Sequence, residues 1–211
     1  MIISHNPKFL CLNPPKTGTG YMEFVFRHSG YFTDEDSKLI KNRLKTFLMF
    51  NIRHNTATRA KESFTKLGLN FDDYYKFCVV RNPWVRAVSY YNMNIKNGVV
   101  YKNFGEFIDF LLDQPNQSEY YKYSSKTIDY VCSLENLNND IRHISNILNI
   151  DIEKQLDPQY FMSINTYLYN PNPVDYSKYS GIFTDDLVDK IADFEEDVIK
   201  LKGYECPKIF K

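Results

Sequence analysis

The sequence lacks the charge imbalance and the long apolar runs that mark several large classes of protein. Its 211 residues carry 26 lysines and arginines against 26 aspartates and glutamates. The chain therefore lacks the net positive charge that would favour nucleic-acid binding. No apolar run reaches membrane-spanning length, and Asn6, Pro7 and Lys8 interrupt the apolar residues near the N-terminus. We therefore expect a cytoplasmic protein that binds neither nucleic acid nor membrane.

Metal-ligand patterns are also missing. The four cysteines form no close pair and show no metal-ligand spacing. Cys11, Cys78 and Cys132 lie in apolar, strand-like runs, which favours buried free thiols in a reducing compartment. Three of the four histidines have no partner at ligand spacing. The sequence predicts no metal site.

No internal repeat, coiled coil or low-complexity linker divides the chain, and its length suits one well-packed domain spanning residues 1–211. Buried strands are expected at 9–13, 76–81 and 129–134. Helices are expected at 19–28, 55–67, 83–96, 104–112, 137–148 and, as one long helix capped by Thr184, up to Gly203. This alternation predicts an α/β domain with a mostly parallel sheet.

The most informative stretch follows the first strand, where Pro-Pro-Lys-Thr-Gly-Thr-Gly occupies positions 14–20. Glycines let the backbone close around an anion, N–H groups at the helix start point at it, and Lys16 adds a positive charge. The ATP- and GTP-binding loop requires Gly, four residues and then Gly-Lys-Ser/Thr, whereas here Lys16 precedes both glycines. The stretch predicts a phosphate cradle of another kind; the alternative is a glycine-rich connection with an incidental lysine.

A second anion-binding element is expected where Arg81 ends a strand and Pro83 begins a helix. Because ligands bind at the carboxyl ends of parallel strands, Lys16 and Arg81 are expected at the same edge of the sheet. Arg81 offers a forked donor set that suits phosphate, and Ser89 lies on the helix that begins right after it. This pair predicts a ligand with phosphate groups at two ends.

These stretches resemble the sulfotransferases that use 3′-phosphoadenosine 5′-phosphosulfate (PAPS). Residues 15–19 resemble that family's 5′-phosphosulfate loop, and residues 77–91 resemble its 3′-phosphate segment. Weaker similarity to the carbohydrate-type branch, with its heparan 2-O and chondroitin-like members, continues at 53–57, 128–131, 134–137 and through the closing helix. The resemblance implies a three-layer fold like that of the P-loop nucleotide kinases, with a mostly parallel central sheet flanked by helices.

The resemblance also implies a reaction, the in-line transfer of a sulfuryl group from PAPS to a hydroxyl or amine, with a carbohydrate as the expected acceptor and no metal. Lys16 would neutralise the charge that develops on the leaving phosphate oxygen. Trp84 would flank the adenine, unless it is a core anchor. The other cofactor contacts implied are Pro15, Lys16, Thr17, Gly18, Thr19 and Gly20 at the 5′ end and Arg81 and Ser89 at the 3′-phosphate.

His54 and Glu23 are the candidates for the base that takes the acceptor's proton. His54 matches the family's His-x-Thr-Ala pattern at an expected loop-to-helix junction; the alternative is a histidine that only bonds to the backbone. Glu23 lies one to two turns into the cradle's helix, where some sulfotransferases place a catalytic glutamate. A glutamate early in a helix is also favourable for electrostatic reasons alone.

Two positions depart from the family's pattern. Gly20 stands where many relatives carry a small hydroxyl residue, which predicts weaker cofactor contacts. Val85 stands where many carry an acidic residue, which predicts that Arg86 lacks its usual partner. These departures keep open a catalytically weak or inactive nucleotide-binding or interaction module on the same fold. A kinase is disfavoured, because a kinase needs a Gly-Lys-Ser/Thr loop and an acidic magnesium ligand at a strand end.

No motif indicates the acceptor, and only the types of residue present bear on it. Tyrosines at 101, 120, 121, 123, 167 and 169 suit stacking on sugar or phenol rings, and they suit packing equally well. Lys41, Arg43 and Lys45 suit an acidic polysaccharide or a solvated face.

Overall fold

The computed structural model describes residues 1–28, 54–160 and 174–211. The segment that contains Lys41, Arg43 and Lys45 lies outside the described residues, as do Tyr167 and Tyr169. The helices are α1 (Thr19–His28), α3 (Ala57–Lys66), α4 (Pro83–Lys96), α5 (Phe104–Leu112), α6 (Leu137–Leu148), α7 (Glu153–Leu156), α9 (Asp185–Phe194) and α10 (Glu196–Lys202). The strands are β1 (Ile2–His5), β2 (Lys8–Leu12), β3 (Tyr75–Val80), β4 (Lys122–Tyr123), β5 (Lys126–Thr127) and β6 (Tyr130–Ser133).

The central sheet has the strand order β1-β2-β3-β6. Strands β2, β3 and β6 run parallel, with Cys11 opposite Phe77 and Val79 opposite Cys132. Strand β1, which the sequence analysis does not predict, runs antiparallel to β2. Asn6 and Pro7, expected only to interrupt an apolar run, lie in the turn that reverses the chain between these two strands.

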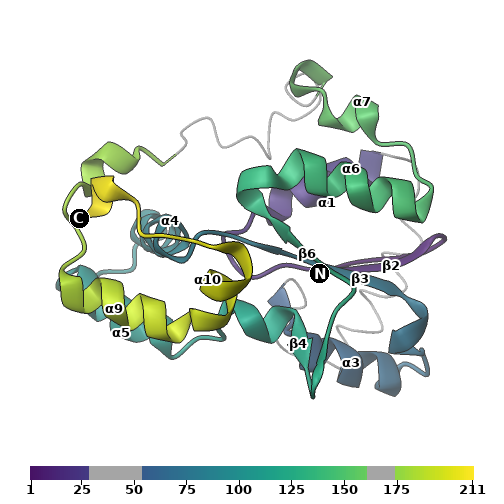
Figure 1. The fold of residues 1–211 in the computed structure, drawn as a ribbon, viewed down its shortest axis with the longest axis horizontal. Helices are drawn as coiled ribbons and strands as arrows, with labels where there is room; N and C mark the ends of the chain where they lie inside the picture. The colour runs from purple at the N-terminus through teal and green to yellow at the C-terminus, as the bar shows by residue number, and fades with distance from the viewer. Residues whose placement is uncertain (29–53, 161–173) are drawn as a thin grey trace.

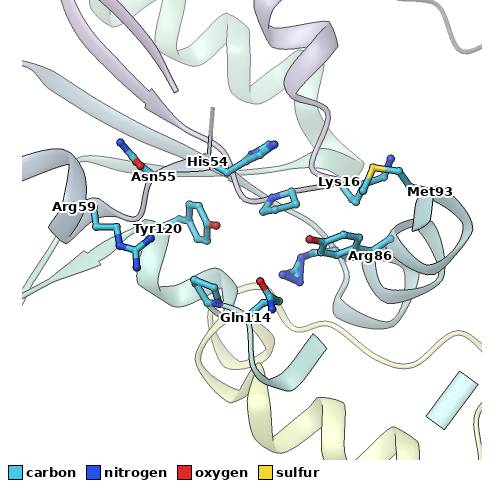
Figure 2. Close-up of a pocket in the computed structure, with 11 residues that line it drawn as sticks. Lys16, His54, Asn55, Arg59, Arg86, Met93, Gln114 and Tyr120 are labelled. Carbon is cyan, nitrogen blue, oxygen red and sulfur yellow. The ribbon is translucent and has the colours of Figure 1, made fainter. Parts of the chain in front are cut away.

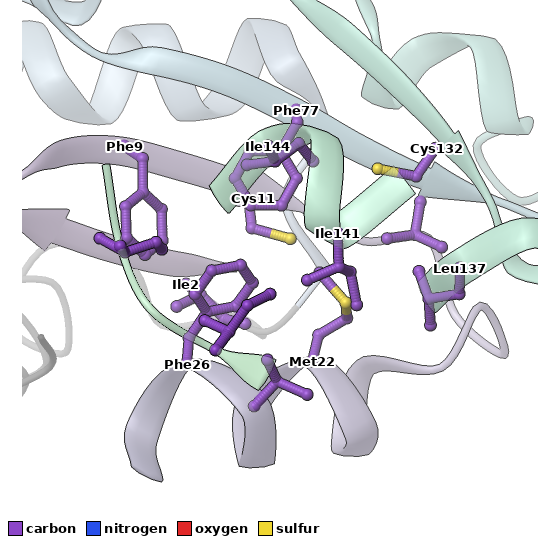
Figure 3. Packing of buried hydrophobic residues seen from close by; sticks show 14 of the residues in the cluster. Ile2, Phe9, Cys11, Met22, Phe26, Phe77, Cys132, Leu137, Ile141 and Ile144 are labelled. Carbon is purple, nitrogen blue, oxygen red and sulfur yellow. The ribbon is translucent and has the colours of Figure 1, made fainter. Parts of the chain in front are cut away.

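Helices cover both faces of this sheet (Figure 1). On one face, α1 and α6 bury Met22 and Ile141 against strand residues such as Phe77 and Cys132 (Figure 3). On the other face, α3 and the β4–β5 hairpin pack against Leu10 and the neighbouring strand residues. A further apolar cluster joins α4, α5 and α9. The predicted α/β fold, with a mostly parallel sheet flanked by helices, is confirmed.

Side-chain caps precede two of the predicted helices. The Thr56 hydroxyl oxygen accepts the Arg59 N–H at 3.5 Å before α3, and the Asn82 side-chain oxygen accepts the Val85 N–H at 3.3 Å before α4. Pro83 occupies the first turn of α4, where its missing N–H costs nothing. The helices expected at 19–28, 83–96, 104–112 and 137–148 are confirmed.

The prediction of one long C-terminal helix is wrong, because the chain breaks at Glu195 into α9 and α10. Glu195 has φ −111° and ψ 21°, and it is only 2% exposed. Its carboxylate accepts the Gln117 N–H at 3.0 Å and faces the Arg86 guanidinium at 3.4 Å. The backbone turns where this buried carboxylate meets its partners. The helical spacing of apolar residues continues through the break, so this pattern in the sequence does not predict it.

Candidate active site

The loop between β2 and α1 contains two residues in the left-handed region, Lys16 with φ +71° and Gly18 with φ +84°. This conformation costs a lysine about 1–2 kcal/mol. A Cβ on Gly18 would lie 2.7 Å from the Leu134 Cδ1 atom, so the position requires glycine. The Thr17 hydroxyl donates to the Pro14 carbonyl at 2.8 Å, and the Met22 N–H donates to the Gly18 carbonyl at 3.1 Å. The predicted cradle is therefore a tightly curled turn at the start of α1.

Thr19, the first residue of α1, carries an unsatisfied polar atom. The residue is 8% exposed, and its Oγ1 has no hydrogen-bond partner among the residues that the structure describes. A buried hydroxyl left unsatisfied costs about 1–3 kcal/mol. The first N–H groups of α1 belong to the same turn and have no partner within the helix. Oxygen atoms of an anionic ligand can satisfy both.

Arg81 lies against the cradle. Its Nη1 donates to the Lys16 carbonyl at 3.2 Å, and its Nη2 donates to the Tyr176 hydroxyl at 2.5 Å. Burial, and after it the positive charges of Arg81 and Lys96, lower the pKa of Lys16. The structure thus brings the cations that follow β2 and β3 together at one edge of the sheet, as the sequence predicts.

A pocket of about 410 Å³ lies beside the cradle (Figure 2). It is lined by Pro15, Lys16, His54, Asn55, Arg59, Arg86, Tyr90, Met93, Gln114, Pro115 and Tyr120. Its volume is in the range of small-molecule sites, roughly 300–1,000 Å³. Among the residues that the structure describes, the lining has one lysine and two arginines but no carboxylate, although the whole chain has no net charge. The pocket therefore favours a ligand rich in hydrogen-bond acceptors.

His54 reaches this pocket from the turn before α3 (Figure 2). Its Nδ1 lies 2.8 Å from the carbonyl oxygen of Asn13, just past the end of β2. A carbonyl oxygen only accepts, so Nδ1 carries the proton and the lone pair of the neutral ring is on Nε2. A general base needs such a lone pair. The structure therefore places His54, in a tautomer suited to a base, on the same pocket as Lys16.

Of the predicted site residues, Pro15, Lys16 and His54 line this pocket. Arg81 and residues 17–20 of the cradle are outside its lining, and so are Glu23, Ser89 and Trp84. Glu23 lies partly buried on α1. Ser89 is 5% exposed and lies on α4, three residues after Arg86. Trp84 is 4% exposed, packs in the cluster that joins α4, α5 and α9, and donates its indole N–H to the Val188 carbonyl at 3.3 Å. The structure places Trp84 as a core anchor, with little of its ring open to an adenine.

Arg86 has a partner, although not the acidic residue at position 85 that many relatives carry. Its guanidinium, with the residue 1% exposed, faces the Glu195 carboxylate, and Nη1 lies 3.4 Å from Oε1. Burial raises the pKa of Glu195, while the charge of Arg86 acts in the opposite direction. The partner lies 109 residues further along the chain, so no local pattern indicates it. The Arg86 Nε, still unpaired within the described part of the chain, belongs to a residue that lines the pocket.

Most of the pocket wall is absent from the sequence-based prediction. Arg86, Tyr90 and Met93 share one face of α4 at helical spacing, and this periodicity is the signal that could have grouped them. Gln114, Pro115 and Tyr120 come from the connection between α5 and β4, and of these only Tyr120 is a predicted acceptor contact. Tyr121 and Tyr123 lie in the core cluster that includes α3.

A family model described as "Sulfotransferase family" matches residues 1–166, which include the cradle, His54, Arg81 and Ser89. No curated protein matches the chain. Within the described ranges, no group of three or more His, Cys, Asp or Glu side chains could hold a metal, and no helix is long and apolar enough to cross a membrane.

Proposed function

Because the chain belongs to the sulfotransferase family, whose members transfer sulfuryl groups, we propose that its donor is PAPS and its acceptor a carbohydrate hydroxyl. The observation that carries this proposal is the contact between the two anion-binding elements. The Arg81 Nη1 donates to the Lys16 carbonyl at 3.2 Å, and Lys16 shares its pocket with His54. One edge of the sheet thus offers donors for two phosphate groups and a base candidate for an acceptor.

The residues of the cradle fit the 5′ end of PAPS. The unsatisfied Thr19 hydroxyl and the left-handed turn from Lys16 to Gly18 suit the oxygens of a phosphosulfate group. Arg81 and Ser89 would hold the 3′-phosphate, the group that distinguishes this donor from ATP. When bound, PAPS supplies the sulfuryl group. Pro15, Thr17 and Gly20 complete the turn around its 5′ end.

Lys16 is the proposed catalytic cation. It would stabilise the negative charge that develops on the leaving phosphate oxygen, an effect that is strong in a partly buried site. Burial and the nearby charges of Arg81 and Lys96 lower the pKa of Lys16, so the protonated amine is held at an electrostatic cost. The negative charge of a bound anion offsets the repulsion from Arg81 and Lys96 and so favours binding.

His54 is the proposed general base. Its Nε2 would take the acceptor's proton, while the Nδ1–H donated to Asn13 fixes the ring and stabilises its protonated form. Glu23 is the second candidate and lies on α1 outside the pocket lining. The alternative function, a nucleotide-binding module without catalysis, needs the cradle but gives His54 no task.

The carbohydrate assignment rests on the mixed chemistry of the pocket. The half-buried Tyr90 offers a flat apolar face. Asn55, Arg59 and Gln114 offer polar groups that can meet several hydroxyls (Figure 2). Sugars present both kinds of surface to a protein. The Asn55 Nδ2 is buried and has no partner within the described ranges, so a ligand oxygen would satisfy it.

The test is transfer of radiolabelled sulfuryl from PAPS to a panel of oligosaccharides, phenols and amines. We expect label on an oligosaccharide with the wild-type protein and at least a hundredfold less with Lys16→Met, about the loss for one electrostatic stabiliser. Label on phenols or amines alone would reject the carbohydrate assignment. Intact binding of 3′-phosphoadenosine 5′-phosphate without transfer to any acceptor would favour the non-catalytic module.

A further inference from the structure

The C-terminal segment 174–211 lies beyond the residues matched by the family model, yet it contacts the segment that carries Arg81. Four side chains between positions 81 and 86 donate hydrogen bonds to it. The pairs are Arg81 with the Tyr176 hydroxyl at 2.5 Å, Asn82 with the Glu205 carbonyl at 2.8 Å, Trp84 with the Val188 carbonyl at 3.3 Å, and Arg86 with the Glu195 carboxylate at 3.4 Å. This segment therefore braces the whole turn between β3 and α4.

Tyr176 is the member of this set that touches a proposed ligand-binding group. Its hydroxyl accepts the Arg81 Nη2–H, and its ring centroid lies 5.9 Å from the guanidinium carbon. The Nη1 of the same guanidinium donates to the Lys16 carbonyl. Arginine has N–H groups beyond these two, so both contacts leave part of the fork able to bind an anion. Tyr176 and the cradle therefore fix the orientation of the fork without using all of its donors.

We propose that the C-terminal segment is a specificity element for the donor, with Tyr176 as a positioning residue that acts through Arg81. This inference rests on the proposed function, in which Arg81 binds the 3′-phosphate of PAPS. An arginine that is already held in place loses less side-chain freedom when it binds an anion, so its contribution to affinity is larger. Discrimination in favour of the 3′-phosphate then depends on a tyrosine 95 residues after Arg81.

The chain offers a conservative variant and a matched control. Tyr176→Phe removes the hydroxyl but keeps the ring, which also packs against Phe210 with centroids 6.0 Å apart. Tyr179 lies in the same short 3₁₀ turn, Tyr176–Tyr179, and donates its hydroxyl to the Asn92 side-chain oxygen at 3.0 Å instead. Tyr179→Phe therefore removes one tyrosine hydroxyl bond from the same turn without touching Arg81.

The experiment is calorimetric titration of the wild-type protein and both variants with 3′-phosphoadenosine 5′-phosphate and with 5′-AMP, which lacks the 3′-phosphate. We expect the wild type to prefer the bisphosphate. Tyr176→Phe should weaken bisphosphate binding by about fivefold to tenfold and leave 5′-AMP binding unchanged. Tyr179→Phe should change neither affinity.

The outcomes separate this inference from the proposed function. A wild-type protein that binds both nucleotides equally well overturns the proposed donor and this inference with it. A wild-type preference that survives intact in Tyr176→Phe overturns the inference alone. Equal weakening of both nucleotides, or the same loss in Tyr179→Phe, would show a general structural role for the turn and would also overturn it.

Discussion

The His54 ring is tied to the Asn13 backbone, with Nδ1 2.8 Å from the carbonyl oxygen. Asn13 directly follows β2, which ends at Leu12, and Lys16 follows three residues later. One strand end therefore positions both the proposed base and the proposed catalytic cation. Because a carbonyl oxygen can only accept a hydrogen bond, Nδ1 must carry the proton. The same contact therefore leaves Nε2 as the ring nitrogen of neutral His54 that can take a proton.

Replacing this base should lower turnover without affecting the donor site. We expect His54→Ala to reduce kcat by about 10²–10⁴-fold, the usual contribution of a general base, with little change in affinity for 3′-phosphoadenosine 5′-phosphate. Glu23→Ala is the matched comparison and should retain most of the activity. Steady-state kinetics on both variants decides between them: full turnover in His54→Ala with a loss in Glu23→Ala would assign the base to Glu23.

Lys16→Met should separate activity from stability. The pKa of Lys16 is lowered in the folded protein, so the unfolded chain holds more protons in the alkaline window below an ordinary lysine pKa of about 10.4. The contribution of Lys16 to stability without nucleotide should therefore rise with pH through that window, against the opposite contribution of the buried tyrosines and cysteines, whose pKa values burial raises and which wild type and variant share. Lys16→Met should lack this rise and melt at or above the wild-type Tm at neutral pH. Thermal unfolding as a function of pH checks this, and a lower Tm for the variant would contradict it.

The two glycines of the cradle should respond in opposite directions. Gly18→Ala places a Cβ at φ +84° and 2.7 Å from Leu134, which should lower the free energy of unfolding by about 1–3 kcal/mol. A Cβ on Gly20 meets nothing within 4 Å, and alanine favours the helix, so Gly20→Ala should raise it by up to about 1 kcal/mol. Urea denaturation of both variants tests this. Equal destabilisation of the two variants would contradict this, because it would mean that position 20 also requires a glycine.

The Arg86–Glu195 pair should show strong energetic coupling. Glu195→Ala leaves a buried guanidinium without its partner, and we expect a loss of about 3–5 kcal/mol in the free energy of unfolding. Adding Arg86→Met removes the stranded charge, so the double variant should recover part of that loss. A double-mutant cycle by urea denaturation measures the coupling, and additive losses would contradict it.

Much of the framework could be predicted from local signals. Pro83 and the Asn82 cap set the start of α4, and the apolar run at 76–81 set β3, because both depend on neighbours in sequence. The cradle was predictable for the same reason, since Lys16 and both glycines lie within the stretch 16–20. The short antiparallel strand β1 was not, because its pairing with β2 depends on a turn of only two residues that reads as an interruption.

The rest depends on contacts between distant parts of the chain. The break at Glu195 follows from a buried ion pair with Arg86, and the apolar period of α9 and α10 continues across it. Arg59 and Gln114 meet in one pocket although 55 residues of sequence separate them. Tyr176 could not be assigned to the site, because its contact with Arg81 is defined only by the folded C-terminal segment.

Thermal stabilisation of the wild-type protein by 3′-phosphoadenosine 5′-phosphate, ATP and 5′-AMP at equal concentrations tests the central claim most directly. At equal concentrations, the ligand that binds the folded state more tightly gives the larger rise in Tm. The proposed clamp of the cradle, Arg81 and Ser89 predicts the largest shift with the bisphosphate. A larger shift with ATP, or no shift with any of the three, would contradict a PAPS-dependent sulfotransferase.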